Sequence, residues 1–576
     1  MENFTDPSMD DDLKFSLMDY SLFGLMLASS AMIGVYFGFF SKKQNTADEY
    51  LLGGKDMNVV PIALSLIACN ISGITILAVP ADVYLYGYQY WLCPISIQIC
   101  IILLYFVTFP VFYNLKLTST YEYLKMRFDS KIRTFTSFLY ALNVFLYLPI
   151  VIYVPALALS QGTGFNIHYI TPVVCGVCIF YTTIGGLKAV VWTDALQTVL
   201  MIGSTVVVTY LGTVSSGGFN EIMRISDDGG RLDMNFDLDP TLRDTFWTIL
   251  IGSMFAWAQI ISISQGTIQK CLALPSLQSV KKALIILAIG MMVVNLCSIY
   301  TGLMMYAKYK DCDPLKSKKI TVHDQMLPYY ILHVAGKIPG LPGLFIAGVF
   351  SAALSSLSAS MNSLSCTIYE DFISQHMPKD YPQDRVSYIL KWIVFSIGFI
   401  CTVLVFVVEQ LGSIQPLVVS MQGVTAGPML GLFLMGMMVP MANSKGALYG
   451  GVGSILAMAY VIFGSQYHKM NGNVVYETKP VSVEGCLHTF NSTTFAEHEP
   501  TEVSFIYRLS FYYYVVLGTF MVFLIGIPVS WFTRDDEPPV HKDLICGVMQ
   551  WAIPKDKKRP PTYYSVEKAI EMVEKN

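Results

Sequence analysis

Hydroxyl side chains follow one side of an otherwise apolar stretch, residues 343–372 (GLFIAGVFSAALSSLSASMNSLSCTIYEDF). Ala352, Ser355 and Ser356 stand at positions i, i+3 and i+4, so a helix would place all three on one face. Two hydroxyl oxygens on the same face of a membrane helix can meet a cation. Small polar residues also serve as packing contacts between membrane helices, and the spacing alone leaves both interpretations open.

A second apolar segment, SLIACNISGITILAVP (65–80), is interrupted at its centre by Asn70, Ser72, Gly73 and Thr75. A helix that unwinds there would expose backbone carbonyls at the depth of a bilayer. Such exposure is tolerated only where the carbonyls line a cavity or hold an ion. Taken together, the two segments favour a cation site over simple packing.

The composition is typical of a polytopic membrane protein. Of 576 residues, 54% are hydrophobic and only 14% are charged. The formal net charge of −4 and the lack of a separate basic domain indicate no nucleic-acid partner. The expected partners are the lipid bilayer and a small-molecule substrate, and the sequence does not indicate an oligomeric state.

Apolar runs of about 20 residues predict an all-α protein with thirteen transmembrane helices. The predicted helices lie near 20–40, 58–82, 91–113, 134–159, 168–187, 190–213, 245–266, 283–307, 341–365, 389–411, 417–440, 446–465 and 510–533.

These helices predict three parts of the chain: an extracellular tail (1–19), a transmembrane domain (20–533) and a solvated cytoplasmic tail (534–576). The N-terminus is expected outside, because most Lys and Arg residues then fall in inside segments. Lys270, in the segment after the 245–266 helix, is counted among them. The acidic N-terminal region does not resemble a cleaved signal, so the first helix is expected to be retained.

Modification sites agree with this orientation. The sequons at Asn3 and Asn491 both fall outside and are predicted glycosylation sites. Cys312 and Cys486 are the cysteines that fall in outside loops, where a disulfide can form, although two cysteines alone leave the bond open. No nucleophile–base arrangement or phosphate-binding glycine loop is visible, so neither an enzyme nor an ATP-driven pump is expected.

Several motifs in order resemble the sodium/solute symporter family. TTIGGLKAVVWTDALQ (182–197) is similar to that family's double-glycine signature and the membrane-facing Asp that follows it, here Asp194. Further similarities lie in TSTYEYLKMRF, QGTIQKCLA, YKDCDP, PGLPGLFIAGVFSAALSS and GPMLGLFLMG. YKDCDP, VPADVYLYG and GPMLGLF are most similar to the branch that carries monocarboxylates, biotin-type vitamins and iodide.

The resemblance implies a leucine-transporter-like fold, with ten core helices (about 58–440) in two inverted repeats of five. It also implies Na+ as the co-transported ion. The family's shared sodium site corresponds here to five residues, the first three through carbonyl oxygens and the last two through hydroxyls: Ala68, Ile71, Ala352, Ser355 and Ser356.

Members with an additional sodium site use the membrane Asp and hydroxyls one turn further along the serine helix. In this chain those positions are Asp194, Ser355 and Ser358, but Ala359 replaces a hydroxyl that two-sodium members carry. The departure predicts a single sodium ion per transport cycle.

The substrate expected from the resemblance is a small organic anion, a monocarboxylate or a vitamin carboxylate, imported across the plasma membrane by alternating access. The sugar branch has charged or amide side chains after the Asn of the broken helix, whereas this chain has Ile74 and Thr75 there. The candidate substrate contacts are Asn70, Thr75, Gln265 and Gln422. No Lys or Arg falls in the middle of a predicted span, so co-bound sodium and half-helix N-termini would neutralise the anion. The alternatives are a neutral or cationic solute, iodide, or a non-transporting sodium-gated sensor.

Overall fold

The computed structural model describes residues 15–41, 46–115, 117, 119–163, 165–320, 323–336, 338–378, 382–411, 414–486, 503–533 and 540–553. Every regular element in this part of the chain is helical. The predicted glycosylation sites Asn3 and Asn491 lie outside the described residues.

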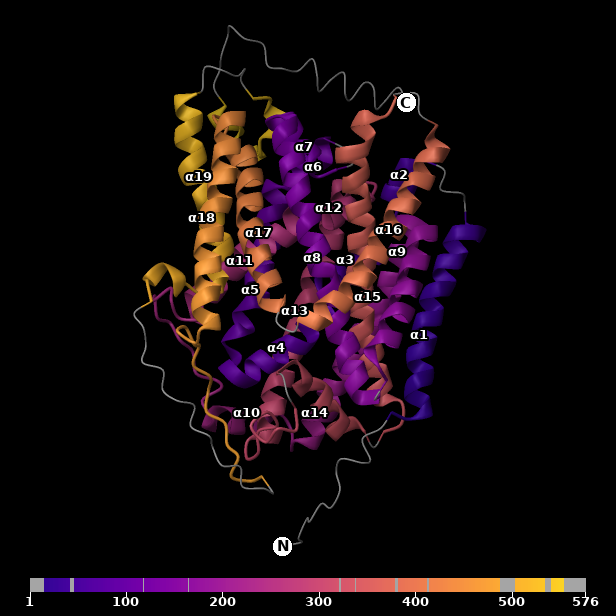
Figure 1. The fold of residues 1–576 in the computed structure, drawn as a ribbon, viewed down its shortest axis with the longest axis vertical. Coiled ribbons are helices and arrows are strands. Elements are labelled where there is room, and N and C mark those ends of the chain that lie inside the picture. Colours follow the sequence, from indigo (N-terminus) through magenta and orange to yellow (C-terminus); the bar gives the residue numbers. More distant parts are fainter. Residues whose placement is uncertain are drawn as a thin grey trace.

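Long helices run side by side along the long axis of the molecule (Figure 1). They are α1 (Leu17–Val35), α5 (Leu92–Val107), α8 (Ser130–Thr163), α9 (Ile167–Ser215), α13 (Leu277–Tyr309), α15 (Leu341–Ile368), α16 (Gln383–Leu411), α17 (Ile414–Met438), α18 (Ser444–Met470) and α19 (Tyr514–Phe532). Within the described ranges, nine helices are long and apolar enough to cross a membrane, or eleven if each of two bent pairs counts as one span.

The first bent pair consists of α3 (Val59–Asn70) and α4 (Gly73–Tyr86), which meet at 52°. Ile71 and Ser72 between them have extended backbone angles, and the Ser72 hydroxyl accepts a hydrogen bond from the Thr75 amide. This N-cap starts a new helix with satisfied donors. The predicted interruption of the 65–80 segment is therefore confirmed.

The second bent pair was not predicted. α11 (Phe246–Ser262) and α12 (Gln265–Leu272) meet at 53° across Ile263 and Ser264. The sequence predicts that the helix ends near residue 266 and that a loop follows it. The structure instead adds two turns of helix that contact α3 and α15.

α9 is 49 residues long but is divided at Gly186, which has φ 54° and ψ −155°. A continuous helix of that length would extend about 74 Å, more than twice the hydrocarbon core of a bilayer. Only glycine adopts this backbone conformation readily. Gly186 therefore separates the two helices that were predicted to meet at this point.

α15 lies at the centre of the bundle. The most apolar part of its span is 89% buried, against 22% for α1 at the rim. α15 packs on α9, α8, α3, α1 and α16, so its serine-bearing face meets protein and not lipid.

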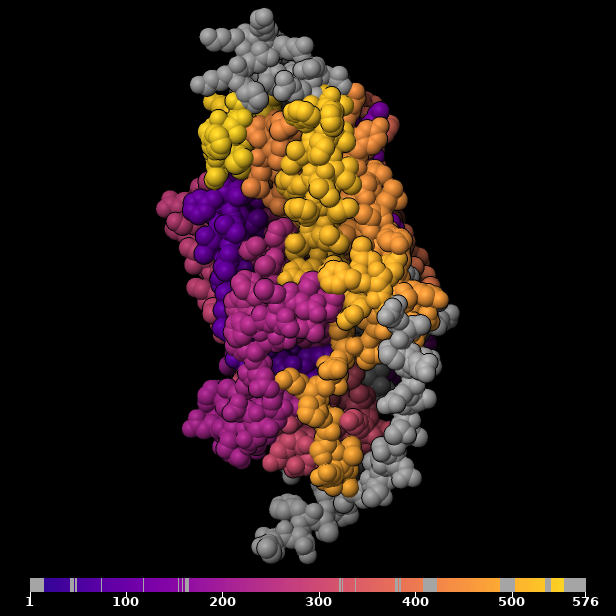
Figure 2. All heavy atoms as spheres, turned by 90° about the vertical axis from the view of Figure 1, so that its left-hand side faces the viewer, coloured from indigo at the N-terminus to yellow at the C-terminus, as the bar shows by residue number. Residues whose placement is uncertain are grey.

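Short elements mark the two ends of the molecule. α10 (Phe219–Asp228) and α14 (Met326–Ala335) gather at one end, while α2 (Ala47–Leu52), α6 (Phe109–Leu115) and α7 (Glu122–Arg127) lie toward the other (Figure 1). The end with α10 also carries the Cys312–Cys486 disulfide, whose Cα atoms are 5.1 Å apart. Residues 471–486 run along the surface there (Figure 2), where Lys479 pairs with Asp233 at 3.2 Å. Segments predicted on one side of the membrane therefore share one end of the protein.

The C-terminal tail is not wholly solvated, contrary to the sequence expectation. Leu544, Ile545 and Cys546 are buried. The Cys546 amide donates to the Met437 carbonyl at the end of α17, and the Tyr123 hydroxyl of α7 donates to the Leu544 carbonyl, both at 3.0 Å. A short apolar run after the last long helix thus returns to the bundle, because burial removes its side chains from water.

Candidate functional site

Oxygen atoms from α3 and α15 converge beside the first break. The Ser355 hydroxyl lies 2.9 Å from the Ala68 carbonyl and 2.9 Å from the Ala352 carbonyl, and all three residues are buried. A hydroxyl has one proton, so it can donate to only one of the two carbonyls at a time. At least one of the two carbonyl oxygens therefore receives no hydrogen bond from Ser355 and can accept a bond from another group, at a point where three oxygens meet.

The remaining predicted members of this site are Ser356 and Ile71. The Ser356 side chain is 4% exposed, and its hydroxyl has no hydrogen-bond partner in the described structure. A buried hydroxyl left unpaired costs about 1–3 kcal/mol, which a bound cation would offset. Ile71 lies in the extended link between α3 and α4, so its carbonyl is outside the regular turns of both helices. The donor set, all uncharged oxygen, fits sodium.

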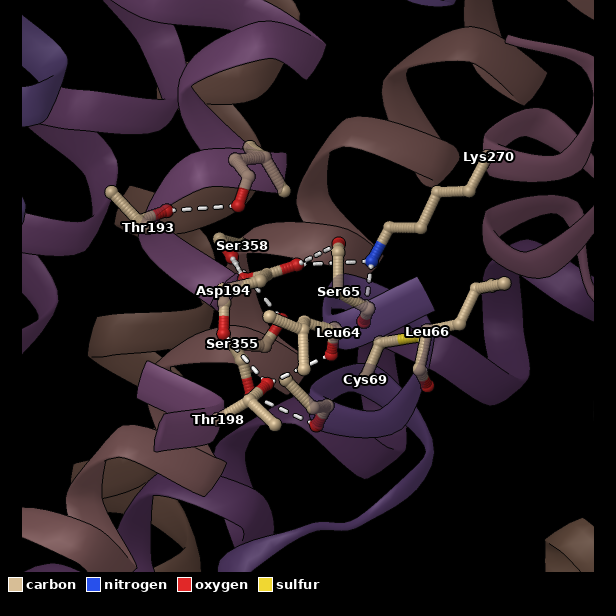
Figure 3. A network of polar contacts seen from close by, with 12 residues as sticks. Leu64, Ser65, Leu66, Cys69, Thr193, Asp194, Thr198, Lys270, Ser355 and Ser358 are labelled. Carbon is tan, nitrogen blue, oxygen red and sulfur yellow. Dashed lines mark hydrogen bonds and ion pairs between the residues drawn. The ribbon is translucent and has the colours of Figure 1, made fainter. Parts of the chain in front are cut away.

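Asp194 lies nearby, in the second half of α9, and is fully buried. One carboxylate oxygen accepts hydrogen bonds from the Ser65 hydroxyl at 2.7 Å and from the Lys270 ammonium at 3.0 Å. The other accepts from the Ser358 hydroxyl at 3.3 Å (Figure 3). The structure thus brings Asp194 and Ser358 together, while the Ser355 hydroxyl is directed to the carbonyls of Ala68 and Ala352.

The position of Lys270 overturns its assignment to an inside loop. The side chain belongs to α12, is 1% exposed, and also donates to the Ser65 carbonyl at 3.2 Å. The α11/α12 break is what carries it into the protein. The sequence contains a pattern that indicates this second break: Ser262-Ile-Ser, shortly before Gly266, is similar to Asn70-Ile-Ser-Gly at the first break.

Two of the four candidate substrate contacts lie at the α3/α4 break. The Asn70 amide donates to the Leu66 carbonyl at 2.7 Å, and the Thr75 hydroxyl lies 3.2 Å from that of Ser72. Gln265 is placed differently. It is fully buried at the start of α12, where its side chain accepts from the Thr120 amide and donates to the Cys366 thiol. These bonds indicate a packing role for Gln265.

The fourth candidate, Gln422, is half-buried on α17. One turn further, Thr425 accepts a hydrogen bond from Asn143 of α8 at 2.8 Å. Tyr147, one turn beyond Asn143, lies close to the Ser72 side chain at the break. A polar face of α8 thus connects the turn that holds Gln422 with the break. The i, i+4 spacing of Asn143 and Tyr147 in an apolar run is the sequence pattern that indicates this polar face.

Comparison with known families agrees with the predicted resemblance. The family model described as "Sodium:solute symporter family" matches residues 50–453. The chain belongs to this family. It is accordingly a multi-pass integral membrane protein, and the predicted family is confirmed.

Relatives with curated names fall in the predicted branch. The chain is 38% identical over 524 residues to the mouse sodium-coupled monocarboxylate transporter 2, covering 90% of this chain and 84% of the relative. It is 36% identical to the human sodium-coupled monocarboxylate transporter 1, covering 90% and 87%. A putative sodium-dependent multivitamin transporter of Drosophila melanogaster is 32% identical, covering 92% and 90%.

Solved structures show the same fold. A Na+-coupled sialic acid symporter in a substrate-bound outward-open state has a TM-score of 0.75 and 25% identity, covering 91% of this chain and 99% of that chain. A nucleobase-cation-symport-1 family transporter in a closed conformation has a TM-score of 0.50 and 15% identity, covering 88% and 98%. The described helices therefore adopt the architecture of sodium-coupled secondary transporters.

Proposed function

We propose that this sodium-coupled symporter imports a small organic anion, a monocarboxylate or a vitamin carboxylate, across the plasma membrane. The names of the relatives support this class of solute. In the proposed cycle, sodium binds at Ala68, Ile71, Ala352, Ser355 and Ser356, and the solute binds beside the α3/α4 break.

The observation that carries the proposal is the meeting of the Ser355 hydroxyl with the Ala68 and Ala352 carbonyls at 2.9 Å. These oxygens come from a broken helix and from the helix it packs against. An ion that binds both holds the two elements together, so its presence changes the relative stability of open and closed arrangements. Sodium binding can thereby drive alternating access without a covalent step.

The proposed topology has thirteen spans, with residues 1–19 outside and residues 534–576 inside. It counts α9 as two spans divided at Gly186, each bent pair as one span, and α17 as a further span. The bent pairs are then the second and seventh spans. A separation of five spans supports two inverted repeats of five, each beginning with a broken helix.

Uptake of labelled solute tests the proposal. Proteoliposomes containing the purified protein should accumulate a monocarboxylate such as lactate, or biotin, when sodium is outside, and should not when potassium replaces it. Uptake of an uncharged solute or of iodide alone would change the solute class. Sodium binding without transport of any solute in the panel would favour the sensor alternative.

A further inference from the structure

The tail segment that follows α19 exposes two large apolar side chains. It contains two short 3₁₀ helices, η10 (Lys542–Leu544) and η11 (Gly547–Ala552). A 3₁₀ helix has three residues per turn, so Val548 and Trp551 lie on one face of η11. Val548 is 61% exposed and Trp551 is 82% exposed, whereas Met549 on the next face packs against the apolar core of the bundle.

Several contacts fix the position of η11. The Gln550 side chain donates to the carbonyls of Lys542 and Ile545, at 3.1 and 3.3 Å. The Cys546 amide, directly before η11, is bonded to the end of α17, and η11 itself packs on α5. Because the segment is held from several sides, its exposed apolar face has a defined direction relative to the bundle.

α5 places this face at the edge of the bilayer. Ile102, Leu103 and Phe106 belong to an apolar span and are between 49% and 61% exposed, as side chains that contact lipid are. α6 follows α5 after one residue and contacts η10, so the tail docks beside the Phe106 end of α5. Trp551 therefore lies where the lipid-facing surface of α5 ends, a depth at which Trp is enriched in membrane proteins.

Positive charge flanks the apolar face. Lys542 is exposed on the tail, and the ammonium of Lys281, at the start of α13, lies 5.8 Å from the centre of the Tyr105 ring of α5. Residues 555–559 (KDKKR), outside the described ranges, add four cations and one carboxylate shortly after Trp551 in the chain. An apolar face that includes Trp, combined with a cluster of Lys and Arg, is typical of segments that bind anionic lipid surfaces.

We propose that η11 and the basic run 555–559 form a binding surface for anionic phospholipids of the cytoplasmic leaflet. Val548 and Trp551 contact the acyl chains near the headgroups, and the basic residues contact the phosphate groups. Two weak contributions act together here, because either an apolar anchor or a polybasic segment alone gives only reversible membrane binding. The inference uses the proposed topology, with residues 534–576 inside, and does not depend on which solute is carried.

Fluorescence quenching by brominated lipids tests the proposal on the full-length protein in nanodiscs. The signal of Trp551 is the wild-type emission minus that of Trp551→Phe. Two bilayers contain equal amounts of phosphatidylserine and phosphatidylcholine, and only one of the two lipids carries bromine on its chains. Quenching of Trp551 should be several-fold stronger when phosphatidylserine carries the bromine, and high salt should reduce this preference because it screens the charges.

Variants of the tail separate charge from bilayer contact. Replacing the four basic residues of 555–559 by Gln should make quenching of Trp551 by the two lipids equal. Lys568→Gln combined with Lys575→Gln removes charge later in the same tail and should keep the wild-type preference. Trp247, an exposed residue of α11 that no basic run follows, should be quenched equally by both lipids when measured against Trp247→Phe.

No quenching of Trp551 by either lipid would overturn the proposal and would leave this face to a protein partner. Equal quenching by the two lipids in the wild type, or the same preference at Trp247, would overturn a selective site for anionic lipid. A preference that survives in the variant with four Gln substitutions would overturn the role of the basic run.

Discussion

At the scale of single residues, the candidate sodium site is built from hydroxyls and carbonyls that have more bonding capacity than the described structure uses. The Ser355 hydroxyl lies within hydrogen-bond distance of two carbonyl oxygens but has only one proton to donate. The buried Ser356 hydroxyl has no hydrogen-bond partner among the described residues. A neutral oxygen set holds an alkali ion without a fixed counter-charge. Binding is then weak enough to be reversed in each cycle.

Replacing either hydroxyl should weaken sodium binding while leaving the fold in place. Each of Ser355→Ala and Ser356→Ala should cost about 1–2 kcal/mol of binding free energy for the lost ligand. The sodium concentration for half-maximal uptake should therefore rise several-fold, measured at matched surface expression.

Ser365→Ala is the matched control, because this buried serine of α15 bonds to Asn362 of its own helix. Its sodium dependence should equal that of the wild type. Unchanged sodium dependence in both site variants would rule out this location for the ion.

At the scale of elements, breaks in helices place the functional groups. The α3/α4 link frees carbonyls beside Ser355, and the α11/α12 link brings Lys270 to Asp194. Gly186 divides α9 so that its second half presents Asp194 to α3 and α15. Each break depends on residues that either tolerate unusual backbone angles or cap a new helix.

Gly186→Ala should destabilise the protein by about 1–3 kcal/mol, because a side chain strains the backbone at φ 54° and ψ −155°. The expected result is a lower melting temperature in detergent and reduced surface expression. Gly176→Ala, in the first half of the same helix, has open space around its Cβ position and should be neutral or slightly stabilising. Equal stability of the two variants would contradict a break that requires glycine.

At the scale of the whole molecule, opposite ends collect different segments. The disulfide and α10 lie at one end, whereas α7 and the buried part of the C-terminal tail lie at the other. This separation supports a chain that alternates across the bilayer. The charge bias and the sequons predict that the end with α10 faces outward.

Glycosylation and tag accessibility test the proposed orientation. Protein made in a glycosylating cell should migrate faster on a gel after glycosidase treatment, and Asn491→Gln should remove part of that shift. An epitope tag placed after Lys568 should be labelled only after the cells are permeabilised. Labelling of that tag in intact cells would invert the topology.

The sequence by itself determined the family, the apolar spans, the serine-bearing helix and the interruption at Asn70–Thr75. These features depend on local pattern, since hydrophobic run length and polar interruptions are properties of neighbouring residues. Only the tertiary structure decided that Lys270 pairs with Asp194, 76 positions away, and that Gln265 bonds to Thr120 and Cys366. Partners so distant in the chain are selected by helix packing and by the free-energy cost of leaving a buried charge or amide unpaired, which no local pattern specifies.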